Sequence, residues 1–411
     1  MSVSFHRSPA GGRFLRALAV TAAAVLLLIL LSAVAAHGRI AAPVSTTYFP
    51  VRVTEVLSAE ETLYGSDNAM RDLVLTFSAV TEEGETVTAT QTISDGVIMG
   101  EVREVSVGDR VILMNNAPED DAPNYVMTTF VRTDVLLWLG VIFALLLILF
   151  GRGKGLAALV ALALTCAAVF CCFVPAVLAG KNIPLWLCIT CIYITVITLL
   201  LIGGAGKKSL AAILGCLGGT LISAIVMAVT DCFLHMTGHL DETTVYLLYL
   251  DTPAPLDLRA LLYAAILIGS LGAVMDVAVD ISASLHEISV KVSHPTFREL
   301  FRSGITIGRD LMGTMSNTLI LAYIGSSLSV VLLIAGGNNA PLFTMLNQER
   351  IVFEILQALV GSLGILSALP LTAALSALLF RASAEVRDEF AEQLEAADRA
   401  EKEENGRSDG N

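Results

Sequence analysis

The sequence has little charge for its length: 15% of its 411 residues are Asp, Glu, Lys or Arg, whereas 55% are hydrophobic. Soluble domains usually carry about 25% charged residues, so this chain has too few to cover a water-facing surface. The composition therefore excludes a cytosolic enzyme and a disordered scaffold, and it predicts an integral membrane protein in contact with the lipid bilayer. Basic residues are scarcer than acidic ones, 25 against 38. Because nucleic-acid phosphates require basic patches, we expect no nucleic-acid partner.

Catalytic motifs are missing as well. The sequence contains no His-Glu-x-x-His, no Walker loop and no Gly-x-Ser-x-Gly, each of which places reactive groups in a defined local structure. We therefore expect no enzymatic activity, and the sequence does not identify a cofactor. Seven cysteines are present, all in or beside apolar runs. Cys188 and Cys191 have the spacing of a redox or metal pair, but their apolar surroundings favour a packing role.

Long apolar runs are abundant. A run of about 20 apolar residues can cross the hydrocarbon core as a helix, and the sequence contains eight runs of roughly this kind. They are residues 17–36, 135–150, 156–179, 184–203, 209–230, 259–281, 311–335 and 351–380. The predicted fold class is an α-helical multipass membrane protein of about eight transmembrane helices.

Lys and Arg in the short connections indicate the orientation, because they are enriched on the cytoplasmic side. Close to the apolar runs, thirteen lie in the alternate segments that include both termini, whereas the opposite short segments hold only Lys181, Arg259 and Arg350. We therefore expect a location in the cell membrane with both termini in the cytoplasm. Residues 1–36 have an alternative interpretation as a signal peptide, since their basic and apolar zones end in Ala-Val-Ala. Cleavage there would leave seven helices.

Four regions follow from this topology. Residues 1–36 form the first helix or a signal-like anchor, residues 37–133 an extracytoplasmic domain, residues 134–380 a membrane domain of about seven helices, and residues 381–411 an acidic cytoplasmic tail. The extracytoplasmic domain contains no cysteine and has five short apolar or alternating stretches, which is typical of strands. We expect a small all-β barrel, for which the OB fold is one candidate.

A pair of carboxylates inside an apolar run is the strongest chemical signal. Asp276 and Asp280 are four residues apart, so they share one face of a helix. A charged side chain at the centre of a bilayer costs about 2.5–3.5 kcal/mol on insertion scales. The pair should therefore face protein, water or a cation. The alternative is that Asp280 lies near the cytoplasmic boundary and that neighbouring donors hold Asp276.

The next apolar run opens with small and hydroxylated residues. Its candidates for an ion or solute path are Asp310, Thr314, Asn317 and Ser327. Side chains of these types also form hydrogen bonds between packed membrane helices. The sequence leaves open whether they line a path or join helices.

A third group lies where residues 209–230 end. Asp231, His235 and His239 are each four residues apart. On a continuous helix they would face one way, and these side chains suit a divalent metal ion. The alternative is a solvated loop, since Gly238 weakens a helix there.

Two stretches resemble a known family of bacterial multipass membrane proteins, the YibE/F family. They are GSLGAVMDVAVDISASLHE at Gly269–Glu287 and GRDLMGTMSNTLILAYIGSS at Gly308–Ser327. The resemblance extends over roughly residues 50–380, and it implies a first helix, an extracytoplasmic β domain and a block of membrane helices. Asp276, Asp310, Gly313 and Asn317 lie inside the two motifs. The resemblance does not imply a substrate.

We therefore expect a bacterial membrane permease or channel-like protein that moves a small ion or solute through a polar path around Asp276 and Asn317. A transport site requires polar groups inside a helical bundle. The alternative is a non-transporting assembly or signalling component whose β domain docks a partner. A homo-oligomer, or a complex with a related membrane subunit, is compatible with either function.

Overall fold

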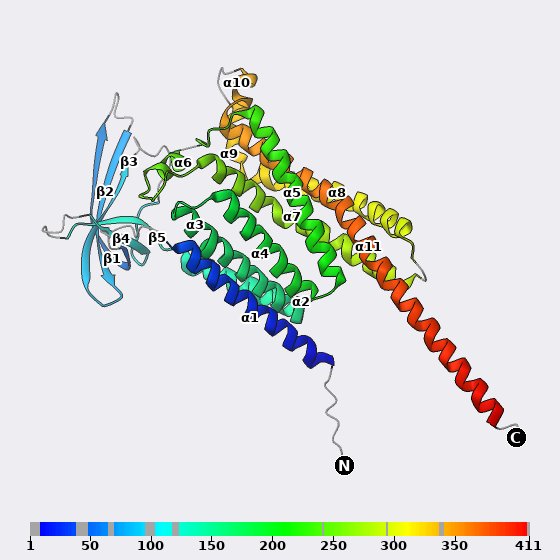
Figure 1. The fold of residues 1–411 in the computed structure, drawn as a ribbon. Coiled ribbons are helices and arrows are strands. Elements are labelled where there is room, and N and C mark those ends of the chain that lie inside the picture. The colour runs from blue at the N-terminus through cyan, green and yellow to red at the C-terminus, as the bar shows by residue number, and fades with distance from the viewer. Residues whose placement is uncertain are drawn as a thin grey trace, which may run out of the picture. The chain divides into compact units, whose positions relative to one another are not determined.

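The structure, a computed structural model, describes residues 9–37, 48–64, 70–94, 103–116, 123–240, 242–292, 295–336 and 341–408. The chain divides into two compact units. One comprises residues 41–150, and the other comprises residues 1–40 together with 151–411. The strands belong to the first unit and most of the helices to the second (Figure 1).

The first unit contains a closed barrel of five strands. These are β1 (Tyr48–Tyr64), β2 (Met70–Thr81), β3 (Thr86–Ser94), β4 (Arg110–Asn115) and β5 (Tyr125–Phe130). Their order around the barrel is β1-β2-β3-β5-β4, with β3 and β5 parallel and the other described pairs antiparallel. The prediction of a five-stranded β domain is confirmed, although β1 and β2 are longer than the sequence pattern indicates.

Alternation of side chains builds the core of the barrel. Along β2, Leu73, Leu75, Phe77 and Ala79 are buried, as the period of two in a strand requires. The polar Gln91 is buried among them, and its amide is satisfied because it donates to the carbonyl of Arg103 at 3.0 Å and accepts from the N–H of Val105 at 2.9 Å. This side chain therefore fixes the loop before β4.

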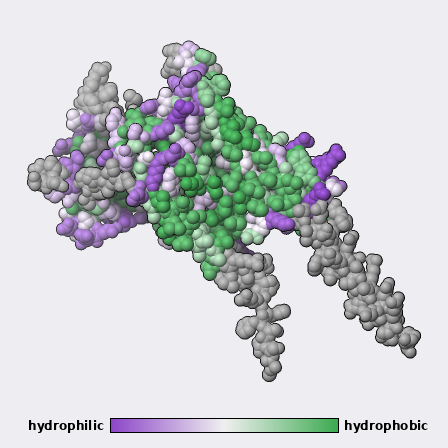
Figure 2. Space-filling model, viewed as in Figure 1, coloured by the Kyte–Doolittle hydropathy of each residue, from purple (hydrophilic) through white to green (hydrophobic). Residues whose placement is uncertain are grey.

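Helices make up the rest of the described chain. They are α1 (Pro9–Ala36), α2 (Thr133–Ala168), the π-helix η2 (Val169–Phe173), α3 (Val174–Leu178), α4 (Ile183–Gly203), α5 (Lys207–Leu234), α6 (Glu242–Tyr246), the 3₁₀ helix η3 (Leu247–Tyr249), α7 (Leu258–Lys291), α8 (Phe297–Ser326), α9 (Leu328–Gly336), α10 (Leu342–Leu346) and α11 (Glu349–Ser408). Large apolar side chains cover much of the outer surface of the helical unit (Figure 2).

Six helical segments within the described ranges are long and apolar enough to cross a membrane. They are Leu18–Ala36, Thr133–Leu178, Ile183–Gly203, Lys207–Leu234, Leu258–Lys291 and Glu349–Arg381. The second is 46 residues long, and its backbone leaves helical geometry at Arg152, where φ is 49°. This break lies in the gap that the sequence analysis places between two apolar runs. The expected run at 311–335 differs, because it is divided between α8 and α9 at Ser327 and is not among the six segments.

Small residues set the spacing between α5 and α11. A β-carbon on Gly215 would lie 2.8 Å from Cβ of Thr372, and one on Gly219 would lie 2.7 Å from Cβ of Ala368. Such distances leave no room for a side chain, so the two backbones approach closely along residues four apart, as small residues allow in membrane helices. On another side of α11, a β-carbon on Gly304 of α8 would lie 2.8 Å from Cβ of Ala373. The helix α11 is therefore packed between α5 and α8.

The helix α1 packs against the helical unit through its backbone carbonyls. The Tyr193 hydroxyl donates to the carbonyl of Ala24 at 3.0 Å, and the Cys172 thiol donates to that of Leu28 at 3.6 Å. The Lys181 ammonium donates to the carbonyl of Val34. These bonds are one helical turn or more apart and connect α1 to η2, α4 and the connection between α3 and α4.

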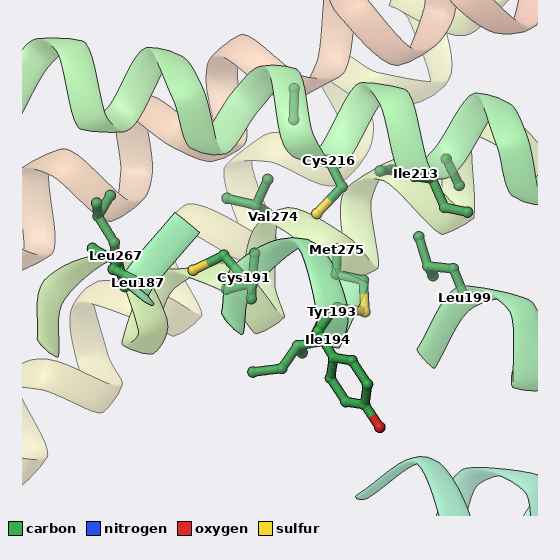
Figure 3. Close-up of a cluster of buried hydrophobic side chains, with 14 of the residues drawn as sticks. Leu187, Cys191, Tyr193, Ile194, Leu199, Ile213, Cys216, Leu267, Val274 and Met275 are labelled. Atoms are coloured by element: carbon green, nitrogen blue, oxygen red, sulfur yellow. The ribbon is translucent and has the colours of Figure 1, made fainter. Parts of the chain in front are cut away.

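A cluster of buried side chains joins α4, α5 and α7 (Figure 3). Cys191 lies in it beside Leu187 and Val274, whereas Cys188 is exposed and all seven cysteines are free. Burial raises the cost of an isolated polar group, and a cysteine in this setting behaves as a small apolar side chain. The packing interpretation of Cys188-x-x-Cys191 therefore fits the side-chain positions.

Candidate functional site

Two carboxylates lie on an exposed face of α7. The side chains of Asp276 and Asp280 are exposed, as are Gly269 and Gly272 on the same face, whereas Val274 and the rest of the opposite face are buried. In the part of the chain that the structure describes, neither carboxylate forms a hydrogen bond or an ion pair. The pairing of Asp276 and Asp280 on one helix face is thus present, but it faces outward from the single chain.

The helix α8 runs antiparallel to α7 with a register that the packing contacts establish. A β-carbon on Gly269 would lie 3.6 Å from the Tyr323 hydroxyl and 3.4 Å from Nε2 of Gln357. Two turns further along α7 is Asp276, and two turns back along α8 is Ser316. Residues seven apart lie on nearly the same line of a helix, so Asp276 lies at the level of Ser316. The Ser316 hydroxyl is buried and has no hydrogen-bond partner within the described ranges.

Polar side chains cover the outer face of α8. We name this set the α8 polar face, and all of its members are exposed. They are Arg302, Thr306, Arg309, Asp310, Gly313, Thr314, Asn317 and Thr318. The three threonines donate their hydroxyls to carbonyls of α8 itself, at 2.8–3.0 Å. Asn317, Arg309 and Asp310 have no such local bond among the described residues, and their side chains remain available to a partner.

The α8 polar face lies at the level of the middle of the apolar segment of α11. The contact of Gly304 with Ala373 and the contact of Leu319 with Gly361 align α8 with residues 361–373 of α11. Those residues are central in the apolar segment Glu349–Arg381. The α8 polar face and the α7 carboxylates are therefore level with the central part of this apolar segment.

Ser327 does not join this group. It is buried and ends α8, with its N–H donating to the carbonyl of Tyr323 at 3.0 Å. It is 11 residues beyond Ser316, which is about 16 Å along a helix. Of the predicted path residues, the structure therefore brings Asp276, Asp280, Asp310, Thr314 and Asn317 onto two adjacent helices and leaves Ser327 apart.

Tyr323 and Gln357 are polar neighbours of the α7 face that the sequence does not connect with it. They come from α8 and α11 and meet at Gly269. A tyrosine or a glutamine in an apolar run does not itself indicate which helix it will face. Only the packing of three helices brings them together. Glu354, one turn before Gln357, forms an ion pair with Arg350 at 3.6 Å.

The predicted metal ligands Asp231, His235 and His239 do not share a helix face. The helix α5 ends at Leu234, and His235 adopts a left-handed conformation with φ of 50°. The Asp231 carboxylate is buried and bonded to Arg259 and to the Tyr263 hydroxyl. Within the described ranges, no group of three His, Cys, Asp or Glu side chains is placed to hold a metal ion.

A second carboxylate secures the loop after α5. Glu349, at the start of α11, accepts from the N–H and the hydroxyl of Thr237 at 2.6 and 2.7 Å, and from the N–H of Gly238 at 2.6 Å. Gly238 has φ of 94°, and a β-carbon there would lie 2.7 Å from Cβ of Leu258. This loop is therefore a structural joint between α5, α7 and α11.

Comparison with known proteins connects this helical block to one family. No curated protein and no solved structure matches the chain. The family described as YibE/F-like protein matches residues 139–382, which include α7, α8 and the apolar part of α11 but not the β-barrel. The matched segment is more than half of the chain and contains both stretches on which the resemblance in the sequence depends. The chain belongs to the YibE/F-like protein family.

Proposed function

We propose that this membrane protein is a permease or channel-like protein that moves a small ion or solute along the exposed faces of α7 and α8. The observation that carries the proposal is the position of Asp276 and Asp280. They are unpaired in the described chain, they lie beside the α8 polar face, and they are at the depth of the apolar middle of α11.

The free-energy cost of these charges depends on what surrounds them. Each costs about 2.5–3.5 kcal/mol at the centre of a bilayer on insertion scales, and no contact in the described chain offsets this cost for Asp276 or Asp280. Water, a cation or a neighbouring polar surface would offset it. The two faces together hold three carboxylates, Asp276, Asp280 and Asp310, against two arginines, Arg302 and Arg309. The local charge is therefore negative, which favours a cation over an anion.

The proposed membrane topology has eight crossings. In addition to the six apolar segments, it divides the segment Thr133–Leu178 at Arg152 and adds the polar helix α8, which lies alongside α11. The excess of Lys and Arg in one set of connections supports cytoplasmic termini, with the β-barrel outside the cytoplasm of a bacterial cell. The strand order β1-β2-β3-β5-β4 with a parallel β3–β5 pair supports an OB-like barrel.

The test is a paired measurement on Asp276→Asn. This substitution keeps the shape and hydrogen-bonding capacity but removes the charge. Purified protein in proteoliposomes would be assayed for movement of K⁺, Na⁺ and protons with fluorescent indicators, and its thermal stability would be measured in parallel. The matched control is Glu287→Gln, on the same helix face but exposed at the cytoplasmic end, where Glu287 lies 4.0 Å from Lys291.

We expect cation flux with the parent protein and with Glu287→Gln, and loss of flux with Asp276→Asn at unchanged or higher thermal stability. Full flux in Asp276→Asn would end the case for this carboxylate. The proposal assigns no enzymatic activity to the chain.

A second function has support from one observation. The α7 and α8 polar faces are exposed on the single chain, as a surface for assembly would be. In that case the protein would be a non-transporting assembly or signalling component whose barrel docks a partner. Absence of flux from the parent protein, together with loss of assembly in Asp276→Leu but not in Asp276→Asn, would favour this alternative.

A further inference from the structure

We propose that the α8 polar face packs against the same face of a second copy of this chain, around a two-fold axis parallel to the membrane normal. The proposal shares its surface with the proposed path, but its test is independent of flux. The occupant must be polar, because the face lies at the level of residues 361–373 of α11, in the middle of an apolar segment, where lipid offers no hydrogen bonds.

The arrangement of charges on α8 favours a second copy over an unrelated polar protein. Arg309 and Asp310 are adjacent in sequence, so they lie at nearly the same depth and point about 100° apart around the helix. In a parallel pair of helices, a two-fold axis sets one flank of a helix against the opposite flank of its copy. Arg309 of one copy then faces Asp310 of the other, and the contact occurs twice.

The centre of the face has the same self-complementarity. Gly313 and Asn317 lie between the two flanks, and nothing lies within 4 Å of a β-carbon on Gly313, so a second backbone can approach closely there. A side-chain amide both donates and accepts hydrogen bonds. Around a two-fold axis parallel to the membrane normal, Asn317 meets Asn317 of the second copy at equal depth, and the two amides satisfy each other.

This packing leaves the α7 carboxylates beside the interface and not inside it. Arg309, Ser316 and Tyr323 are seven residues apart and form the flank of α8 that faces α7, as the contact of Tyr323 with Gly269 shows. Asp276 and Asp280 lie next to that flank. The second copy would therefore form one wall of the space around Asp276, a wall that the single chain lacks.

Cysteine cross-linking in native membranes tests the proposal. The variants Gly313→Cys and Asn317→Cys place a thiol at the centre of the face, and Leu221→Cys places one on the exposed apolar side of α5. The parent protein, with its seven native cysteines, sets the baseline. We expect oxidation to give a product of twice the 43.5 kDa chain at positions 313 and 317, several-fold above the parent and above Leu221→Cys.

Exchanging the charges of Arg309 and Asp310 tests whether the cross-linking depends on their contact across the two-fold axis. Arg309→Asp should reduce the cross-linked fraction at position 317 several-fold, and adding Asp310→Arg should restore it, because the exchanged pair is again complementary across the axis. Cross-linking at 313 and 317 no greater than at 221, in protein that is monodisperse in detergent, would overturn the proposal. A product that contains a different protein would overturn it in favour of a second kind of subunit. A cross-linked dimer with full flux in Asp276→Asn would leave this inference standing and refute the proposed path.

Discussion

The substitution Gly219→Ala tests the close packing of α5 on α11. The new β-carbon would lie 2.7 Å from Cβ of Ala368 and 3.0 Å from the carbonyl oxygen of Gly364. Favourable carbon contacts are about 3.5–4.0 Å, so the two helices must move apart by roughly 1 Å. One of the groups is a backbone carbonyl and the other a methyl group on the backbone, and neither can rotate away.

The magnitude follows from comparison with a matched substitution. Overpacking a well-packed core costs about 1–3 kcal/mol. The exchange of glycine for alanine in a helix also brings a gain of about 1 kcal/mol. Gly140→Ala in α2 has the same gain but meets nothing within 4 Å. The difference between the two variants therefore isolates the steric term, and we expect Gly219→Ala to be less stable than Gly140→Ala by about 1–3 kcal/mol.

The assay is equilibrium unfolding of both variants and the parent in the same detergent, followed by intrinsic fluorescence. Stability of Gly219→Ala equal to that of Gly140→Ala would refute the close contact. Greater stability of Gly219→Ala would refute it more strongly, because the β-carbon would then fill space that the structure shows as occupied.

Two further predictions concern polar contacts outside the path. Arg259→Met leaves the buried Asp231 with the Tyr263 hydroxyl but without its cation, so the free energy of unfolding in detergent should fall by about 1–3 kcal/mol. Adding Asp231→Asn should recover part of this loss. An unchanged free energy of unfolding would show that Arg259 is not the partner. At the start of α8, the N–H and hydroxyl of Thr296 donate to Glu299 and lower the pKa of that carboxyl from its usual 4.5. A carboxyl whose pKa is lower in the folded state than in the unfolded state stabilises the fold at pH values above its unfolded pKa. The stability advantage of the parent over Thr296→Ala should therefore be complete above about pH 4.5 and should decline as the pH falls further. An advantage that grows on acidification would contradict this.

The barrel was accessible to sequence reasoning because its signals are local. The apolar residues at 73–80, followed by the glycine at position 84, indicate a strand and its turn without any distant partner. Apolar runs are equally local, which is why most of the long helices coincide with predicted spans. The pairing of Asp276 with Asp280 on one face follows from helix geometry alone.

The packing of α8 could not be predicted from local sequence signals. Its apolar residues are interrupted by the α8 polar face, and its close contacts depend on Gly304 and Gly308 meeting α11, about 65 residues later in the chain. Asp231 is likewise unavailable to a metal ion because it forms an ion pair with Arg259, which belongs to another helix. Spacing within one segment cannot show a partner on a different segment, and these were the features that the sequence could not specify.

The most direct test of the proposed path is whether the α7 face is hydrated at membrane depth. Gly272→Cys places a thiol one turn from Asp276 with open space around it, and Leu221→Cys places one on the apolar side of α5. The rates of reaction with a small, positively charged methanethiosulfonate would be measured in proteoliposomes, above the rate of the parent protein. We expect Gly272→Cys to react about tenfold faster or more, since the nearby carboxylates concentrate cations, and we expect adding Asp276→Asn to reduce this rate. Equal, slow reaction at both positions would show that the face is buried in lipid or protein and would contradict the proposed path.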